Sequence, residues 1–220
     1  MFTRILAVAL LGAATACSAQ TPASEPAGAF QAGRDYHLIE PAQPTASGER
    51  IEVIEVFGYS CGACASFQPL IDEWSAKQAD DVAFSYTPAM FGGIWDTFGR
   101  AFYTAETMGL LDKTHNDMFK AVHVERRIRT EGDIPAFYTN YGVKADEFAA
   151  TMNSFAVNAK TARAQQQAPR YGVTSTPTLI VAGKYRVEVG ASNSHARMLQ
   201  VVDQLVAKER AERAAKADPS

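Results

Sequence analysis

The stretch IEVIEVFGYSCGACASF, from Ile51 to Phe67, contains the residues that decide the fold of this chain. Its first seven residues are apolar apart from two glutamates, and this β-branched run is typical of a buried strand. Gly58 follows the strand, and two cysteines, Cys61 and Cys64, then open a segment with helical spacing of apolar residues as far as about Gln78. A buried strand therefore leads directly into a helix that begins with a Cys-x-x-Cys motif.

The rest of the chain adds strands on both sides of a long helical stretch. Val82 to Thr87 predicts a second strand, whereas residues from about 94 to 168 show apolar stripes at helical spacing and no strand. Thr178 to Val181 and Tyr185 to Val189 predict a hairpin, followed by a helix from about Ser194 to Lys208. We expect an α/β fold with a β-α-β half and a β-β-α half, separated by an inserted helical domain.

The N-terminus has the features of an export signal. Residues 1–16 contain Arg4 and then an apolar run that is shorter than the roughly 20 residues a membrane-spanning helix needs. A small residue directly before Cys17 resembles a bacterial lipobox, although Ala14 replaces its usual leucine, so Cys17 is a candidate for lipidation. The alternatives are that Cys17 stays as a free thiol or that cleavage after Ala19 removes it. All of these interpretations place the protein outside the cytoplasm.

Composition divides the remaining chain into three parts. Residues 17–34 are rich in Ala, Pro, Ser and Thr and are expected to form a flexible linker. Residues 35–212 should form one folded domain, with the helical insertion at about 94–168, and the charged residues 213–220 should be a disordered tail.

Charge and cysteine content exclude several classes of protein. The chain has 220 residues, with 21 Lys and Arg against 24 Asp and Glu, and this balance gives no reason to expect nucleic-acid binding. Three cysteines are too few for a small disulfide-stapled fold. A zinc site would need ligands beyond the two motif cysteines, and there is neither a second cysteine pair nor a closely spaced histidine pair. We expect no metal and no cofactor.

The position of the two cysteines favours redox chemistry. A thiolate at a helix N-terminus is stabilised by unpaired backbone N–H groups and by the helix dipole, which lowers its pKa from about 8.5. Cys61 should therefore attack, and Cys64, about one turn further on, should resolve the mixed disulfide. A purely structural disulfide and the binding of copper or another metal are the alternatives.

Three segments together resemble a known family. DYHLIEPAQPT, IEVIEVFGYSCGACASF and GVTSTPTLIVAGKY match, in order and spacing, the DsbA family of periplasmic thiol:disulfide interchange proteins, which have a thioredoxin-like fold. The similarity covers residues from about 35 to 210. It implies that Cys61 is the exposed nucleophile, that Cys64 is its buried partner, and that Thr176 and Pro177 form a cis-proline loop that pairs with an extended substrate peptide.

The resemblance also implies a role for Glu55 and a set of partners. Glu55 matches a buried acid that relays a proton to or from Cys64, although an acid that reaches solvent at the strand's end is the alternative. The expected partners are reduced exported polypeptides and a membrane oxidase of the DsbB type, with the protein acting as a monomer, free in the periplasm or tethered there through Cys17.

Two positions depart from the family pattern. Gly62-Ala63 replaces the familiar Pro-His between the cysteines, and none of the four histidines stands beside the motif in the sequence. We therefore expect a weaker oxidant than the strongest members. Ser85 stands where a lysine often accompanies the buried acid, which leaves Glu55 without a counter-charge.

The sequence predicts a periplasmic thiol–disulfide oxidoreductase that introduces disulfide bonds into exported proteins through Cys61 and Cys64. The alternatives are a disulfide reductase or isomerase of the same fold, and a non-catalytic module that binds copper or peptides.

Overall fold

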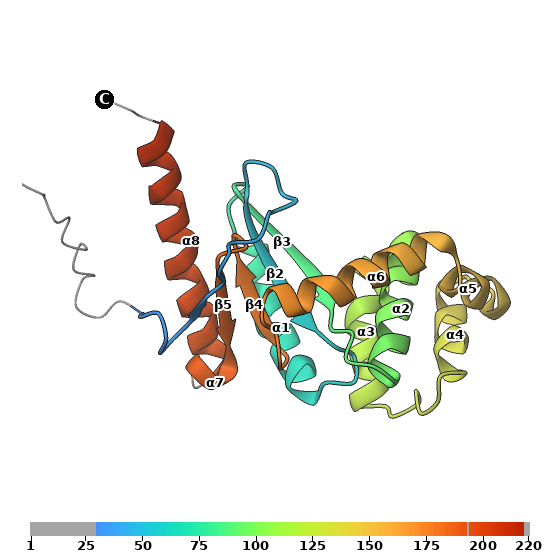
Figure 1. Ribbon diagram of the computed structural model, residues 1–220. Coiled ribbons are helices and arrows are strands. Elements are labelled where there is room, and N and C mark those ends of the chain that lie inside the picture. Colours follow the sequence, from blue (N-terminus) through green and yellow to red (C-terminus); the bar gives the residue numbers. More distant parts are fainter. Residues whose placement is uncertain (1–29, 193, 218–220) are drawn as a thin grey trace, which may run out of the picture.

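The computed structural model describes residues 30–192 and 194–217. The strands of this part of the chain form one sheet (Figure 1): β1 (His37–Leu38), β2 (Ile51–Phe57), β3 (Val82–Pro88), β4 (Thr178–Val181) and β5 (Tyr185–Glu188). The helices are α1 (Gly62–Ala76), α2 (Ile94–Thr107), α3 (Leu111–His123), α4 (Asp133–Tyr138), the 3₁₀ turn η1 (Thr139–Tyr141), α5 (Ala145–Met152), α6 (Phe155–Arg170), α7 (Val189–Ser192) and α8 (His195–Ala217).

The sheet has the strand order β1-β5-β4-β2-β3. β2 runs parallel to β3, with α1 as the crossover, and antiparallel to β4, which forms a hairpin with β5. All seven residues of β2 are buried, because β2 has a strand on each side and helices on both faces. The predicted α/β fold, with a β-α-β half and a β-β-α half separated by helices, is confirmed.

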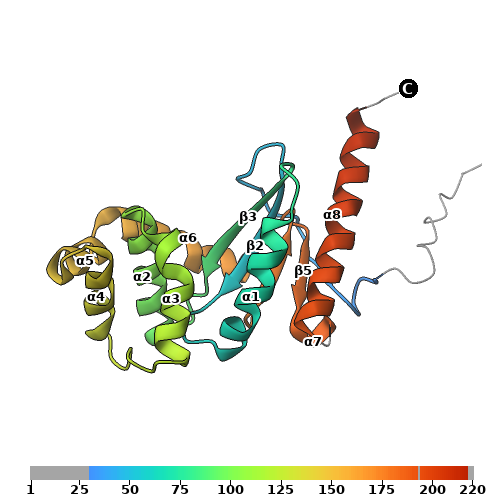
Figure 2. The same ribbon diagram turned by 180° about the vertical axis from the view of Figure 1, so that it is seen from behind.

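Helices cover the two faces of the sheet differently. α1 and α8 lie side by side on one face (Figure 2), where Phe67 and Ile71 of α1 and Val202 of α8 pack against the sheet. On the other face, Ala168 near the end of α6 packs against Ile54 and its neighbours. α1 and α8 both begin at the same edge of the molecule, which is the lower edge in Figures 1 and 2.

The inserted helices form a second core at the end of β2. Phe57, the last residue of β2, contacts Tyr59, Phe102 and Phe119 through edge-on or tilted aromatic rings. The same core contains Cys64, whose side chain is fully buried. The motif therefore lies at the junction of the sheet and the helical domain.

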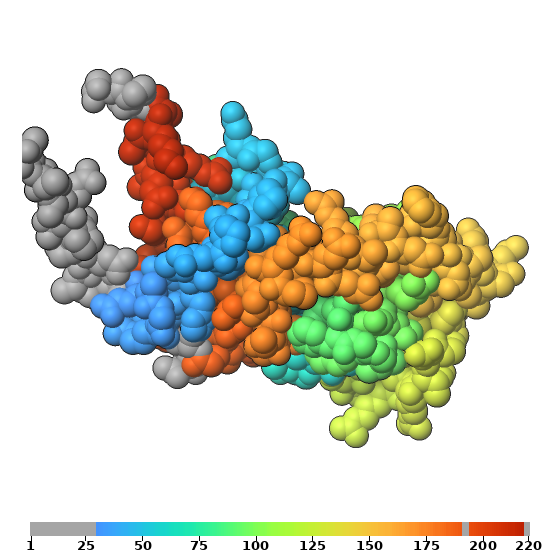
Figure 3. All heavy atoms as spheres, in the orientation of Figure 1, coloured from blue at the N-terminus to red at the C-terminus, as the bar shows by residue number. Residues whose placement is uncertain are grey.

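Both ends of the folded region extend further than the sequence indicates. Contacts with the domain extend back to Phe30, before the expected start near Asp35: the Gln204 side chain of α8 accepts a hydrogen bond from the Phe30 N–H and donates one to the Phe30 carbonyl. The space-filling view shows this first segment lying against the β5 and α8 side of the molecule (Figure 3).

At the other end, α8 continues to Ala217, so residues 213–217 are helical and not a disordered tail. Charged side chains hold this extension on the domain: Lys184 donates two hydrogen bonds to the buried carboxylate of Glu209, and Arg210 pairs with Asp81.

The predicted export signal, Cys17 and most of the predicted linker lie outside the described residues. Within the described ranges, none of the helices combines the length and the apolar character that crossing a membrane requires.

Candidate active site

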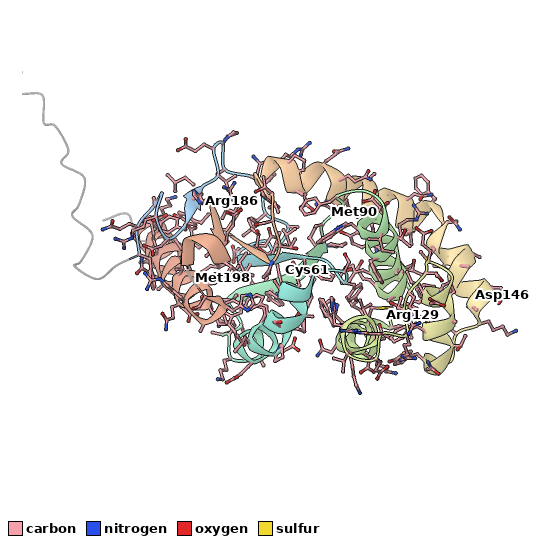
Figure 4. All side chains as sticks on the ribbon, turned by 90° about the horizontal axis from the view of Figure 1, so that it is seen from below. Cys61, Met90, Arg129, Asp146, Arg186 and Met198 are labelled. Atoms are coloured by element: carbon pink, nitrogen blue, oxygen red, sulfur yellow. The ribbon has the colours of Figure 1, made fainter. Side chains whose placement is uncertain are left out.

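The Cys-x-x-Cys turn starts α1 directly after a loop of three residues. Cys61 is the N-cap of the helix, with φ −86° and ψ 112°, and its sulfur accepts a hydrogen bond from the Cys64 N–H at 3.3 Å. An N-cap sulfur in this position satisfies one of the free N–H groups of the first turn. Figure 4 shows Cys61 near the centre of the face at which α1 begins.

The two cysteines have opposite environments. Cys61 is partly exposed, and its pKa is lowered to about 5, above all by the hydrogen bond from the Cys64 thiol, with contributions from Thr176 and the N–H groups of Cys64 and Ala63. The Cys64 thiol is fully buried, and burial raises its pKa well above the ordinary value. Cys61 is therefore a thiolate at neutral pH, whereas Cys64 keeps its proton.

The Thr176–Pro177 loop lies against this pair. The peptide bond between the two residues is cis, as the resemblance implies, and the Thr176 carbonyl oxygen is 3.5 Å from Cys61 Sγ. Pro177 is buried and directly precedes β4, so the antiparallel pairing of β4 with β2 holds the loop beside the motif. Thr176 is partly exposed, which leaves its backbone at the surface next to the reactive sulfur.

Glu55 is completely buried in the middle of β2. Neither of its carboxyl oxygens has a hydrogen-bond partner among the described residues. Burial raises its pKa well above the ordinary value, and the negative charges of Asp72 and Cys61 act in the same direction. The alternative in which this acid reaches solvent is therefore wrong, and Glu55 holds a proton close to the two cysteines.

The prediction that Ser85 stands beside Glu55 is wrong. Ser85 pairs with Ile54 and is exposed, whereas the residue opposite Glu55 in the parallel register is Tyr86. A shift of one residue moves a strand side chain to the other face of the sheet, and this reverses the assignment of Ser85. Glu55 therefore has an aromatic neighbour from β3.

The Tyr86 hydroxyl continues a polar chain toward the surface. It accepts a hydrogen bond from Gln68 at 2.8 Å and donates one to Asp72 at 3.1 Å. Asn116 of α3 donates to the other Asp72 oxygen at 2.7 Å. Asp72, Tyr86 and Asn116 line a cavity of about 450 Å³ between α1, β3, α2 and α3.

Histidines lie closer to the motif than their positions in the sequence indicate. Two of them fix the loop before Cys61: His115 Nδ1 is 2.8 Å from the Tyr59 hydroxyl, and His123 Nε2 is 2.8 Å from the Tyr59 carbonyl oxygen. Burial lowers the pKa of His115 to about 3, so it is neutral. The spacing of eight residues on one helix was the available signal, because it places both rings on the same face of α3.

A third histidine, from the far end of the chain, packs against α1. His195 is the first residue of α8, and its ring packs against Phe67 of α1 with 5.0 Å between the centroids. The negative charge of Cys61 raises the pKa of His195, although burial, the larger effect, leaves that pKa below its ordinary value. The sequence pattern contains no signal for this approach, because more than 130 residues separate the two positions.

Known proteins are similar to this chain in sequence and in fold. A family model described as a DSBA-like thioredoxin domain matches residues 52–202. The chain belongs to the DsbA-like thioredoxin family. "Thiol:disulfide interchange protein DsbA" of Pseudomonas syringae pv. tomato is 41% identical over 204 residues, covering 92% of this chain and 94% of the relative.

Solved DsbA structures share the fold. The crystal structure of Pseudomonas aeruginosa DsbA is 38% identical with a TM-score of 0.78, covering 85% of this chain and 97% of that one. That of the Xylella fastidiosa oxidoreductase DsbA is 36% identical with a TM-score of 0.79, covering 83% and 98%. As a DsbA-like protein that shares the fold of solved DsbA structures over 83–85% of its length, the chain is a thiol:disulfide oxidoreductase.

Proposed function

We propose that this DsbA-like protein introduces disulfide bonds into exported proteins in the periplasm, with Cys61 and Cys64 as its redox pair. The observation that carries the proposal is the asymmetry of the two thiols: a partly exposed Cys61 with a pKa of about 5 beside a buried Cys64 whose pKa is raised. A stabilised Cys61 thiolate favours the reduced form of the pair, and a pair that prefers to be reduced oxidises other thiols.

The reaction begins with the Cys61–Cys64 disulfide. A substrate thiolate attacks Cys61 Sγ, the S–S bond breaks, and Cys64 leaves with the electron pair and takes up a proton. A second substrate thiolate then attacks the substrate sulfur of the mixed disulfide and releases Cys61 as a thiolate. The substrate thereby loses two electrons and two protons; the protein gains both electrons and one proton, and the other proton goes to solvent.

Three groups assist these steps. The buried carboxyl of Glu55 is the proton donor and acceptor for Cys64, because both groups lie in the same water-poor interior. The backbone of Thr176 pairs with an extended substrate segment and brings the substrate sulfur to Cys61. Gly62 and Ala63 are exposed and have no polar side chain, so they leave the sulfur open to a polypeptide.

The regenerating partner in this proposal follows from the family, whereas the export and the tether follow from the sequence of residues 1–17. A membrane oxidase of the DsbB type accepts the two electrons from reduced Cys61 and Cys64 and restores the disulfide. The protein acts as a monomer, and it is exported by residues 1–16 and tethered through an acylated Cys17.

The reduction potential tests the direction of exchange. The domain with Cys17→Ser is equilibrated with glutathione, and the fraction of Cys61–Cys64 disulfide is measured. We expect a potential near or above roughly −180 mV, which is the range of thiol oxidases, although the missing Pro-His keeps it below the strongest members. A value near roughly −270 mV would overturn the proposal in favour of a reductase. The variants Cys61→Ser and Cys64→Ser show that the signal comes from this pair.

A further inference from the structure

We propose that His195 is the electrostatic partner of the active-site thiolate: its imidazolium, at the start of α8, stabilises the reduced form of Cys61. This inference rests on Cys61 and Cys64 being the redox pair. His195 does not touch the substrate sulfur in this role; it is a positioning residue that acts through the charge of Cys61.

The packing of two helices places His195 at the edge of the molecule where Cys61 lies. α1 and α8 lie side by side and begin at the same edge of the molecule, so the first residue of α8 and the N-cap of α1 share that edge (Figures 1 and 2). The His195 ring is 5.0 Å from the Phe67 ring, which lies less than two turns after Cys61 on α1. Met198, one turn after His195, points into the same core, and Figure 4 shows it on the side of α8 nearest Cys61.

Three titratable groups of the described residues respond to the charge of Cys61: Cys64 of α1, Glu55 of β2 and His195 of α8. Cys64 and Glu55 keep their protons, so His195 is the group of this set that can carry a positive charge. Arg197, on the same helix, is turned away and pairs with Asp35 at 2.9 Å.

Cys61 and His195 must shift each other's pKa by the same amount. If the thiolate of reduced Cys61 raises the pKa of His195, then a charged His195 lowers the pKa of Cys61 by the same amount. In the oxidised protein there is no thiolate, so the pKa of His195 is lower than in the reduced protein. Both values lie on the acid side of 6.5, because burial disfavours the imidazolium.

This linkage changes the proton balance of reduction. At pH values above both pKa values of His195, two electrons and one proton convert the disulfide into a Cys61 thiolate and a Cys64 thiol. Between the two pKa values of His195, reduction also places a second proton on the imidazole. The protein therefore becomes a stronger oxidant as the pH falls from 7 toward 5.5, by more than the two thiols alone produce.

Nuclear magnetic resonance tests the linkage directly. The His195 ring signals, assigned by their loss in His195→Gln, are titrated in the oxidised and reduced protein, after thiol counting has shown that the disulfide forms. We expect a higher pKa in the reduced protein. Equal pKa values in the two redox states overturn the role of His195, whereas failure to form the disulfide overturns the proposed redox pair instead.

Variants supply the second readout. At pH 5.5, His195→Gln should lower the equilibrium constant for oxidation of glutathione about two- to fivefold, the size expected for a partly solvated charge pair, with no change at pH 8. His195→Lys, which keeps a positive charge at both pH values, should restore the constant at pH 5.5 and raise it at pH 8. His37→Gln, on edge strand β1, is the matched control and should change neither.

A structural role for His195 predicts a different result. Loss of the contact with Phe67 would lower the melting temperature of His195→Gln and His195→Lys alike and would move the equilibrium constant equally at both pH values. That outcome, or an unchanged constant at pH 5.5, contradicts the proposal.

Discussion

At the scale of single residues, the site combines one partly exposed thiol with a buried thiol and a buried acid, and the three groups differ in charge. Cys61 carries the negative charge of the reduced protein, whereas Cys64 and Glu55 stay neutral because burial disfavours their ionised forms. A second anion beside the Cys61 thiolate would oppose it. The neutrality of the two buried groups therefore supports the low pKa of the exposed one.

Glu55→Gln tests the protonation state of the buried acid through stability. In the unfolded chain the carboxyl ionises near its ordinary value of 4.5, whereas in the folded protein its pKa is raised. Above pH 4.5 the unfolded state has released a proton that the folded state retains, so wild-type stability falls as the pH rises toward the folded pKa. The amide cannot ionise, so the variant should gain stability relative to wild type between pH 4 and pH 8, by about 1 to 3 kcal/mol.

Chemical denaturation at pH 4, 6 and 8 measures this difference. The amide's own unpaired groups cost the same free energy at every pH, so the change in the difference with pH is the informative quantity. Glu147→Gln on α5, an exposed position, makes the same chemical change and should follow the wild-type profile. A constant difference between Glu55→Gln and wild type would show that Glu55 is ionised in the folded protein.

At the scale of elements, local signals in the sequence predict some parts of the site and not others. The apolar run Ile51–Phe57 and the cysteines after it define a strand, a turn and a helix start through neighbouring residues alone, so this unit could be predicted. Tyr86 and His195 reach the site only through strand register and helix packing. A register error of one residue was enough to place Ser85 beside Glu55, since side chains alternate along a strand.

The length of α8 is a second feature that local sequence signals did not predict. Its last residues lack an apolar stripe, and a sequence without such a stripe predicts a frayed tail. The fold supplies partners that the pattern does not contain: Glu209 is buried against Lys184, Arg210 pairs with Asp81, and Arg213 donates to the Glu49 carbonyl. Charged residues therefore extend this helix through contacts with distant loops.

Truncation tests whether this extension stabilises the domain. Deletion of residues 209–220 removes the buried carboxylate of Glu209 and the Arg210–Asp81 pair, and should lower the melting temperature by about 2 to 6 °C. The reduction potential should not change, because this end of α8 is the one opposite the active-site edge (Figure 1). Deletion of residues 218–220 alone is the control and should leave both unchanged. An unaltered melting temperature after the longer deletion would mean that the helical extension is only a surface feature.

At the scale of the whole molecule, Cys61 and the N-terminal end of the described chain lie at different places on the domain. Cys61 lies at the edge where α1 begins, at the junction of the sheet and the helical domain (Figure 4), whereas Phe30, the first described residue, is hydrogen-bonded to Gln204 of α8. An acylated Cys17 would be joined to Phe30 by residues that span at most roughly 45 Å when fully extended. A tether of that reach would hold the domain close to the membrane and leave the edge with Cys61 free.

Cys17→Ser tests this attachment in the chain expressed with its own residues 1–16. If Cys17 is acylated, wild type should fractionate with membranes and its mature N-terminus should carry the mass of the acyl groups, whereas the variant should appear in the soluble periplasmic fraction. Tethering confines the domain near a membrane oxidase and raises their effective concentration, so the variant should also be reoxidised more slowly in cells at equal abundance. Cys17 is expected to lie in the flexible linker, so the purified variant should keep the wild-type melting temperature and reduction potential. An unmodified wild-type N-terminus at residue 17 or 20, found in the soluble fraction, would instead identify a freely diffusing enzyme that meets the oxidase by collision.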